Sequence, residues 1–200
     1  MGNTDKFEMI AHTYDTPERL QVARAAADAI GEYLDNTKGK KAIDFGCGTG
    51  LVGLNLLEDF QSMLFLDTSQ SMIDQIREKI NLHHIPNAET LCFDFEKDNL
   101  SDLRADCIFM SQVLLHIEDF KPVLKKLYDV LNPGGHLMII DFNKNEEITS
   151  DLVHNGFDQE ELAGVMAELK YKNIRSKTFY QGNKIFMGYD ASMFILDAQK

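Results

Sequence analysis

The chain has 200 residues, the length of one large domain or two small ones, and 44% of them are hydrophobic and 26% charged. This balance excludes disordered, collagenous and disulfide-built proteins. A formal net charge of −12 disfavours binding to a phosphate backbone, so we expect no nucleic-acid partner. No apolar run approaches the ~20 residues that cross a bilayer, so we expect no stable membrane insertion.

The cysteines and the N-terminus indicate the compartment. Cys47, Cys92 and Cys107 are odd in number and lack CxxC spacing, a pattern that predicts reduced thiols and no metal site. The first residues have neither the basic start nor the apolar core of a secretion signal. The sequence therefore predicts a cytoplasmic protein.

The first predicted element is an amphipathic helix. Thr16 and Pro17 are typical of an N-cap and a first helical position, and apolar residues recur at helical spacing from Leu20 to Leu34. We expect residues 1–38 to form a helical cap in front of the rest of the chain.

Short apolar runs typical of buried strands then alternate with helical patterns. The predicted strands are Ala42 to Phe45, Met63 to Asp67, Glu89 to Asp94, Asp106 to Met110 and His136 to Asp141. The helical patterns are Leu51 to Leu57, Met72 to Ile80 and Phe120 to Leu131. This alternation predicts an α/β fold, doubly wound and Rossmann-like, with a mostly parallel sheet and helices on both faces. Residues 40–142 would be its cofactor-binding core, with ligands at the carboxyl ends of the strands.

The rest of the chain is predicted to complete the same domain, 1–200. The run Asn143 to Ser150 is too polar to pack, and residues 143–157 are a candidate lid over the ligand edge. Asp158 is predicted to cap a helix. Two extended segments, Ile174 to Tyr180 and Ser192 to Asp197, are expected to pair antiparallel at the sheet edge, so that residues 158–200 form a C-terminal helix and strand pair.

The strongest chemical signal is the run from Asp44 to Gly50, DFGCGTG, which joins a strand to a predicted helix. Glycines let the backbone approach a ligand closely, and the N–H groups of such a turn favour a carboxylate or a phosphate. No Lys-Ser or Lys-Thr follows at the distance that a P-loop requires. The loop therefore predicts an anionic or nucleotide-like ligand of another kind.

Two cofactors fit this loop. Gly48 to Gly53 is formally GxGxxG, and Asp67 follows 19 residues after Gly48, as in many NAD sites. Asp44, however, would place a negative charge near the pyrophosphate of NAD, whereas it suits the cationic amino group of a methionine moiety. An NAD-dependent reductase and a non-catalytic cofactor-binding module stay open as alternatives.

Five segments in order carry a family resemblance: AIDFGCGTG, FLDTSQSMI, CFDFE, DCIFMSQVLLHIED and LNPGGHLMIID. They resemble the motif series of class I S-adenosylmethionine-dependent methyltransferases. They are most similar to the small-molecule group of methyltransferase types 11 and 12, which includes the ubiquinone and menaquinone C-methyltransferases. The resemblance implies transfer of a methyl group from S-adenosyl-L-methionine to a small organic acceptor, leaving S-adenosyl-L-homocysteine. It also implies a seventh, reversed strand.

The resemblance further implies which residues hold the cofactor. The glycine loop would lie against the methionine end, with Asp44 reaching the amino group. Asp67 would bind the ribose hydroxyls, and Asp94 would accept a hydrogen bond from the adenine amine. The other implied contacts are the loop residues Gly46, Cys47, Gly48, Thr49 and Gly50, then Thr68 and Met72 beside the adenosine, Phe95 beside its ring, Ser111 and Gln112 under the sulfonium, and Tyr14 closing over the cofactor.

Methyl transfer from a sulfonium is an in-line displacement that requires alignment more than proton transfer. An acceptor with a hydroxyl or an acidic carbon would be helped by a base. His116 is the first candidate for this catalytic role, because it lies just beyond Ser111 and Gln112 at the ligand edge. His154, near the candidate lid, is a weaker candidate for substrate contact. The sequence assigns no oligomeric state.

Overall fold

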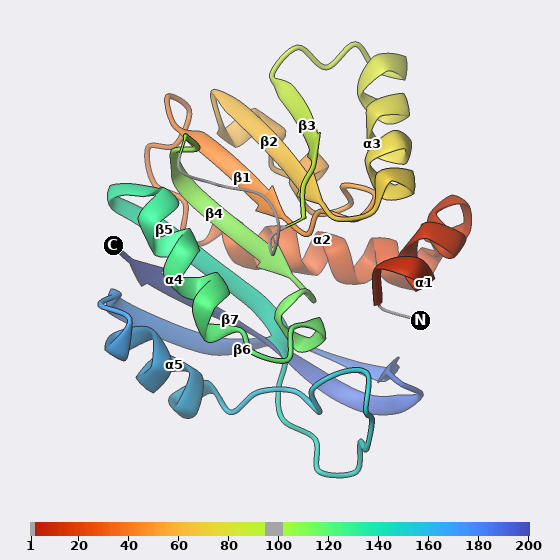
Figure 1. Ribbon diagram of the computed structural model, residues 1–200, viewed down its shortest axis with the longest axis vertical. Coiled ribbons are helices and arrows are strands. Elements are labelled where there is room, and N and C mark those ends of the chain that lie inside the picture. Colours follow the sequence, from red (N-terminus) through yellow and green to blue (C-terminus); the bar gives the residue numbers. More distant parts are fainter. Residues whose placement is uncertain (1–2, 95–101) are drawn as a thin grey trace.

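The computed structural model describes residues 3–94 and 102–200 and contains one seven-stranded sheet in the order β3-β2-β1-β4-β5-β7-β6 (Figure 1). The first five strands pair in parallel, and β7 is antiparallel to both of its neighbours, β5 and β6. The predicted doubly wound sheet with an antiparallel C-terminal pair is confirmed. The strands are β1 Lys41–Phe45, β2 Ser62–Asp67, β3 Ala88–Cys92, β4 Ala105–Ser111, β5 Leu131–Phe142, β6 Lys172–Phe186 and β7 Tyr189–Gln199.

Helices cover both faces of this sheet. In Figure 1, α4 and α5 lie in front of the strands and α2 lies behind them. The predicted caps form: the Thr16 hydroxyl accepts a hydrogen bond from the Arg19 N–H, and the Asp158 carboxylate accepts from the Glu160 and Glu161 N–H groups. The α-helices are α1 Asn3–Ile10, α2 Pro17–Gly31, α3 Gln70–Leu82, α4 Lys121–Val130 and α5 Gln159–Glu168.

The core lies where the central strands are covered on both faces. Phe65, Ile108, Phe109 and Ile139 have no exposed surface. Burial on both faces requires continuous apolar runs in the parallel strands, as the sequence shows. This packing brings the carboxyl ends of β1, β2 and β4 to one edge, which fixes the positions of the loops that follow them.

The prediction of a helix after the glycine loop, from Leu51 to Leu57, is wrong. The segment instead forms two short 3₁₀ turns, η2 Gly53–Asn55 and η3 Leu57–Asp59. In an α-helix the Gly53 N–H would bond to the Thr49 carbonyl. Here that N–H donates to Asp44 Oδ2 at 3.1 Å, and the Thr49 carbonyl accepts from Lys79 Nζ at 2.8 Å. The Gly53 N–H and the Thr49 carbonyl are therefore hydrogen-bonded to side chains and cannot form the first turn of a helix.

The segment 143–157 is fastened to its surroundings. Asn143 forms an isolated bridge with Phe157, and the Asn145 N–H donates to the Asn155 carbonyl at 2.8 Å. Ile148 is buried. The two ends of the segment are therefore joined to each other by backbone contacts, and its role as a lid stays a prediction.

Candidate functional site

A cavity of about 1010 Å³ lies at the carboxyl ends of the parallel strands. Its walls come from the N-terminal segment, residues 3–16, from the ends of β1 to β4, and from η4 Leu114–His116 with the start of α4. Ten of the predicted site residues line it: Tyr14, Gly46, Gly48, Asp67, Thr68, Met72, Asp94, Ser111, Gln112 and His116. Four others, Asp44, Cys47, Thr49 and Gly50, lie in or beneath the same loop without lining the cavity, and Phe95 falls outside the described residues.

The glycine loop requires its glycines for two separate reasons. Gly46 and Gly48 have φ values of +69° and +53°, a region that side chains disfavour. A Cβ on Gly46 would also lie 2.5 Å from Val113 Cγ2. Gly50, with φ +81°, packs against Ile76 of α3 instead of the cavity. The first two glycines therefore present bare backbone to a ligand, and the third lets α3 approach.

Asp67, at the end of β2, joins the glycine loop to α3. Its Oδ2 accepts from the Gly48 N–H at 2.8 Å, and its Oδ1 accepts from the Ser69 N–H at 2.9 Å. Burial raises the pKa of this carboxyl, and these N–H groups oppose the rise. Because Asp67 also lines the cavity, the carboxylate that shapes the loop is open to a ligand.

Asp44 lies one layer below the loop. It is buried and accepts from the Gly53 N–H, and burial raises its pKa to about 8. Cys47 is buried as well, and burial raises the pKa of its thiol well above the ordinary value. Neither residue lines the cavity, so their contact with a cofactor stays a prediction.

The N-terminal segment closes one side of the cavity through Tyr14. A Cβ on Gly48 would lie 3.8 Å from the Tyr14 ring, and the Arg19 guanidinium lies 4.0 Å from the centre of that ring. Burial raises the pKa of the Tyr14 hydroxyl. Tyr14 therefore stands beside the glycine loop, although the two are more than thirty residues apart in the chain.

Two acidic residues of this segment, Glu8 and Asp15, were not predicted from the sequence, and both fasten it to the rest of the chain. Asp15 accepts from Thr49 Oγ1 at 2.5 Å and from Lys79 Nζ at 2.7 Å. Glu8 accepts from the N–H and the hydroxyl of Ser71, at the start of α3. No local pattern could have indicated these pairs, because their partners lie 34 to 64 residues away.

The start of α3 and the end of β3 add apolar and acidic side chains to the cavity. Met72 and Phe93 are buried and line it, together with Asp94. Phe93 was not predicted as a site residue.

Gln112, just after β4, has φ +56°, and its N–H donates to the Ile140 carbonyl at 2.8 Å. The end of β4 is therefore held to β5 directly beneath the cavity.

His116 enters the cavity from η4. Its ring lies edge-on to Phe7 of α1, with 5.3 Å between the ring centres. His154 does not line the cavity, and neither does any other residue of 143–157. It packs against Phe120 and Phe157 and hydrogen-bonds to the Ile117 carbonyl at 2.8 Å.

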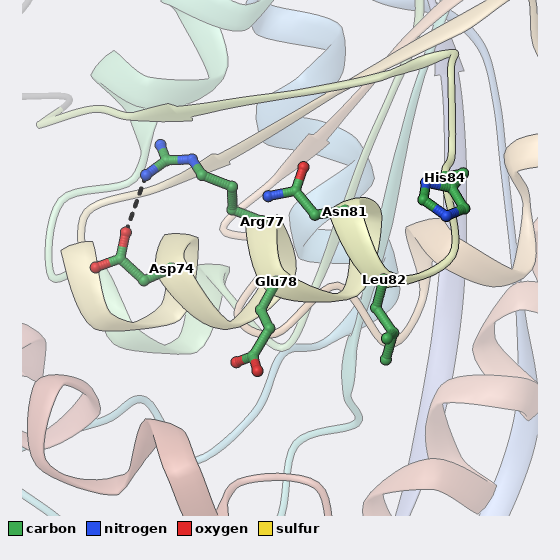
Figure 2. A pocket seen from close by; sticks show the side chains of 6 residues that line it. All are labelled: Asp74, Arg77, Glu78, Asn81, Leu82 and His84. Carbon is green, nitrogen blue, oxygen red and sulfur yellow. Dashed lines mark hydrogen bonds and ion pairs between the residues drawn. The ribbon is translucent and has the colours of Figure 1, made fainter.

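A second hollow lies on the outer surface of α3 (Figure 2). Its six side chains fan out from the helix and the following turn instead of converging, and Leu82 is 71% exposed. An exposed ion pair at 3.0 Å joins Asp74 and Arg77. The hollow contains no predicted site residue, so the carboxyl-end cavity is the candidate site.

Within residues 3–94 and 102–200, no group of three or more His, Cys, Asp and Glu side chains is arranged to hold a metal ion. Nor does any helix there have the length and apolar character needed to cross a bilayer.

Comparison with known proteins supports the resemblance. A family model described as a methyltransferase domain matches residues 43–137. An uncharacterized methyltransferase of Schizosaccharomyces pombe is 24% identical over 193 residues, covering 76% of this chain and 66% of that protein. The ubiquinone/menaquinone biosynthesis C-methyltransferase UbiE of Haemophilus ducreyi is 30% identical over 111 residues, covering 54% of this chain and 43% of that protein.

The fold has a counterpart across almost its whole length. The crystal structure of a SAM dependent methyltransferase from Aquifex aeolicus superposes with a TM-score of 0.72, at 21% identity, over 96% of this chain and 97% of that one. This chain spans less than two thirds of the two curated relatives named above. The resemblance to class I methyltransferases is confirmed in sequence and in fold.

Proposed function

Because this chain shares the sequence motifs and the fold of class I S-adenosylmethionine-dependent methyltransferases, we propose that it binds S-adenosyl-L-methionine and transfers the methyl group to a small organic acceptor. One observation carries the proposal: the glycine loop, Asp67 and Tyr14 line a single cavity at the carboxyl ends of the strands. The cavity lies where the strand order reverses between β1 and β4, the usual position for a ligand in an open α/β sheet.

The residues of the cavity fit this cofactor. Gly46 and Gly48 would leave room for the methionine end, and the Asp67 carboxylate, which lines the cavity, would accept from ribose hydroxyls. Met72 and Phe93 provide apolar walls for a purine, with Asp94 beside them as an acceptor for its amine. About 1010 Å³ is at the upper end of the roughly 300–1,000 Å³ of small-molecule sites, which leaves space for an acceptor.

The acceptor would lie on the side of the cavity formed by Phe7, Val113, His116, Ile117 and Val123. These side chains are apolar apart from His116, which favours a small organic molecule, and the charged Glu118, Asp119 and Lys126 line the cavity as well. In the reaction the nucleophile of the acceptor bonds to the methyl carbon while the carbon–sulfur bond breaks, so the sulfonium becomes a neutral thioether. We assign His116 the removal of the proton from an acceptor hydroxyl or acidic carbon.

The two alternatives from the sequence gain no support. The matched family model and the relatives described above are methyltransferases, which does not favour an NAD-dependent reductase. A cofactor-binding module without an acceptor site does not account for the apolar surface around His116. We further propose that the protein acts in the cytoplasm and does not bind nucleic acid, in line with its net charge of −12.

Isothermal titration with S-adenosyl-L-homocysteine tests the proposal, with NADH titrated in parallel. We expect stoichiometric binding of S-adenosyl-L-homocysteine alone, lost in Asp67→Ala and kept in Asp74→Ala, whose side chain lies in the hollow on α3. Binding of NADH instead, or of neither ligand, would refute the cofactor assignment. Turnover with a panel of acceptors then identifies the methylated atom.

A further inference from the structure

Residues 113–119, which we call the acceptor wall, carry His116 into the cavity. Five of these seven residues line the cavity: Val113, His116, Ile117, Glu118 and Asp119. The wall consists of the short 3₁₀ turn η4 and irregular chain on both sides. One 3₁₀ turn does not fix its own position, so contacts from elsewhere must orient it.

Asp141, near the end of β5, holds the wall from the sheet. Its side chain has no exposed surface, and its Oδ2 accepts from the Leu115 N–H at 3.1 Å. Its Oδ1 accepts from the Phe142 N–H at 2.9 Å. The backbone of Asp141 is fixed by pairing with Phe194 of β7. The carboxylate therefore ties the residue before His116 to a strand in the interior of the sheet.

His154, in the segment 143–157, is the second residue that holds the wall. Its backbone N–H donates to the Leu115 carbonyl at 2.9 Å, and its Nε2 donates to the Ile117 carbonyl at 2.8 Å. Its ring packs against Phe120 and Phe157. Both residues that flank His116 are therefore held by His154, and Leu115 is also held by Asp141.

We propose that Asp141 and His154 are positioning residues of the methyl-transfer site, which fix the acceptor wall and thereby the direction from which His116 meets the acceptor. Neither residue lines the cavity, so both act through the wall. The catalytic role of these two residues rests on the proposed function. Their effect on the orientation of His116 does not, because it concerns the protein without any ligand; in this sense we call Asp141 and His154 the anchors of the wall.

The use of a buried carboxylate supports a positioning role. Burial raises the pKa of Asp141 to about 7, against the opposing effect of its N–H partners. Taking a carboxylate out of water is costly, and an apolar residue of similar size often stabilises a core better. What the carboxylate adds is direction, because it accepts hydrogen bonds from two defined N–H groups at once.

Ring signals of His116 in the NMR spectrum of the ligand-free protein test the anchors, with the assignment made from His116→Gln. Asp141→Asn keeps the size of the side chain but replaces one acceptor oxygen with an NH₂ group. That group cannot accept a hydrogen bond, so one of the two N–H partners, Leu115 or Phe142, loses its acceptor. His154→Leu removes the donor to the Ile117 carbonyl, whereas His154→Gln keeps an NH₂ group near the position of Nε2. We expect the His116 signals to shift or broaden in Asp141→Asn and His154→Leu, and to stay near their wild-type positions in His154→Gln.

The same variants, titrated with S-adenosyl-L-homocysteine, should bind it within about threefold of wild type, because the predicted cofactor contacts share no hydrogen-bond partner with Asp141 or His154. Unchanged His116 signals in both disruptive variants, with only a lower melting temperature, would overturn the inference. So would a failure of His154→Gln to restore the signals.

If Asp141→Asn fails to fold, the His116 signals of His154→Leu and His154→Gln alone test whether the wall is held by these contacts. Wild-type protein that does not bind S-adenosyl-L-homocysteine would contradict the proposed function and leave the NMR result for the anchors intact.

Discussion

The two sides of the cavity are held in place in opposite ways. On the side of the glycine loop, which we propose holds the cofactor and call the cofactor side, the atoms that shape the loop also face the cavity: Asp67 accepts from the Gly48 N–H and lines the cavity. On the acceptor side, the wall is held from behind by Asp141 and His154, and neither touches the cavity. The contrast shows why substitutions on the first side should alter folding and binding together, whereas those on the second can be separated.

The contact between Gly46 and Val113 is where the two sides meet, and substitution there should have the largest effect. Gly46→Ala adds a Cβ 2.5 Å from Val113 Cγ2 at a φ of +69°. The left-handed conformation alone costs a residue with a Cβ roughly 1–2 kcal/mol. We expect a lower melting temperature and at least a ~100-fold loss of S-adenosyl-L-homocysteine affinity by titration.

Gly164→Ala in α5 is the matched control for this substitution, because a Cβ there meets nothing within 4 Å. Alanine in place of a mid-helix glycine should stabilise the protein by roughly 0.5–1 kcal/mol and leave binding unchanged. Wild-type affinity in Gly46→Ala would show that the loop does not contact the ligand.

Asp67→Asn should have the next largest effect, confined to the cofactor side. The amide loses the charge and one of the acceptor positions that serve the Gly48 and Ser69 N–H groups. Hydrogen bonds to charged groups are worth ~1.5–3 kcal/mol, so titration should show affinity roughly 10–100-fold weaker. Asp74→Asn, on the exposed face of α3, should match wild type. An equal loss of affinity in Asp67→Asn and Asp74→Asn would mean that the net charge of the protein, and not the Asp67 site, governs binding.

The pH dependence of stability tests the layer beneath the loop. Burial raises the pKa of Asp44 from an ordinary value near 3.8 to about 8, so between these values the folded protein binds a proton that the unfolded chain has released. The contribution of Asp44 to the free energy of unfolding is therefore fully present below about pH 4 and is lost as the pH rises toward 8.

Urea unfolding of wild type and Asp44→Asn at several pH values measures this contribution as the difference between the two proteins. We expect wild type to lose stability relative to Asp44→Asn as the pH rises. Parallel curves for the two proteins across this range would contradict the raised pKa.

His116→Gln should have the smallest effect on cofactor binding, and it sharpens the comparison from the acceptor side. We expect S-adenosyl-L-homocysteine affinity within about threefold of wild type, because His116 belongs to the acceptor wall and its ring packs against Phe7 of α1. Turnover of a hydroxyl acceptor should fall by roughly 10²–10⁴, the usual contribution of a general base. Turnover that is unchanged for every acceptor would remove His116 from the catalytic role.

The sequence by itself determined the fold class, and it identified the glycine loop and Asp67, which line the cavity. Apolar strand runs that alternate with helical patterns identified the parallel sheet, because each pattern reflects local burial. The glycines of the loop and Asp67 were recognisable because close approach of backbone to ligand restricts the residue types at adjacent positions.

Only the tertiary structure decided the rest. It replaced the helix expected after Gly50 with 3₁₀ turns, because Asp44 and Lys79 take the backbone groups that would begin it. It also joined Asp15 to Lys79 and placed His154 behind the acceptor wall instead of over the cavity. Most of these contacts join residues 30 or more positions apart in the chain through one or two hydrogen bonds. A local pattern reports periodicity and backbone freedom and carries no signal for such pairs, so their positions follow only from the packing of the complete sheet.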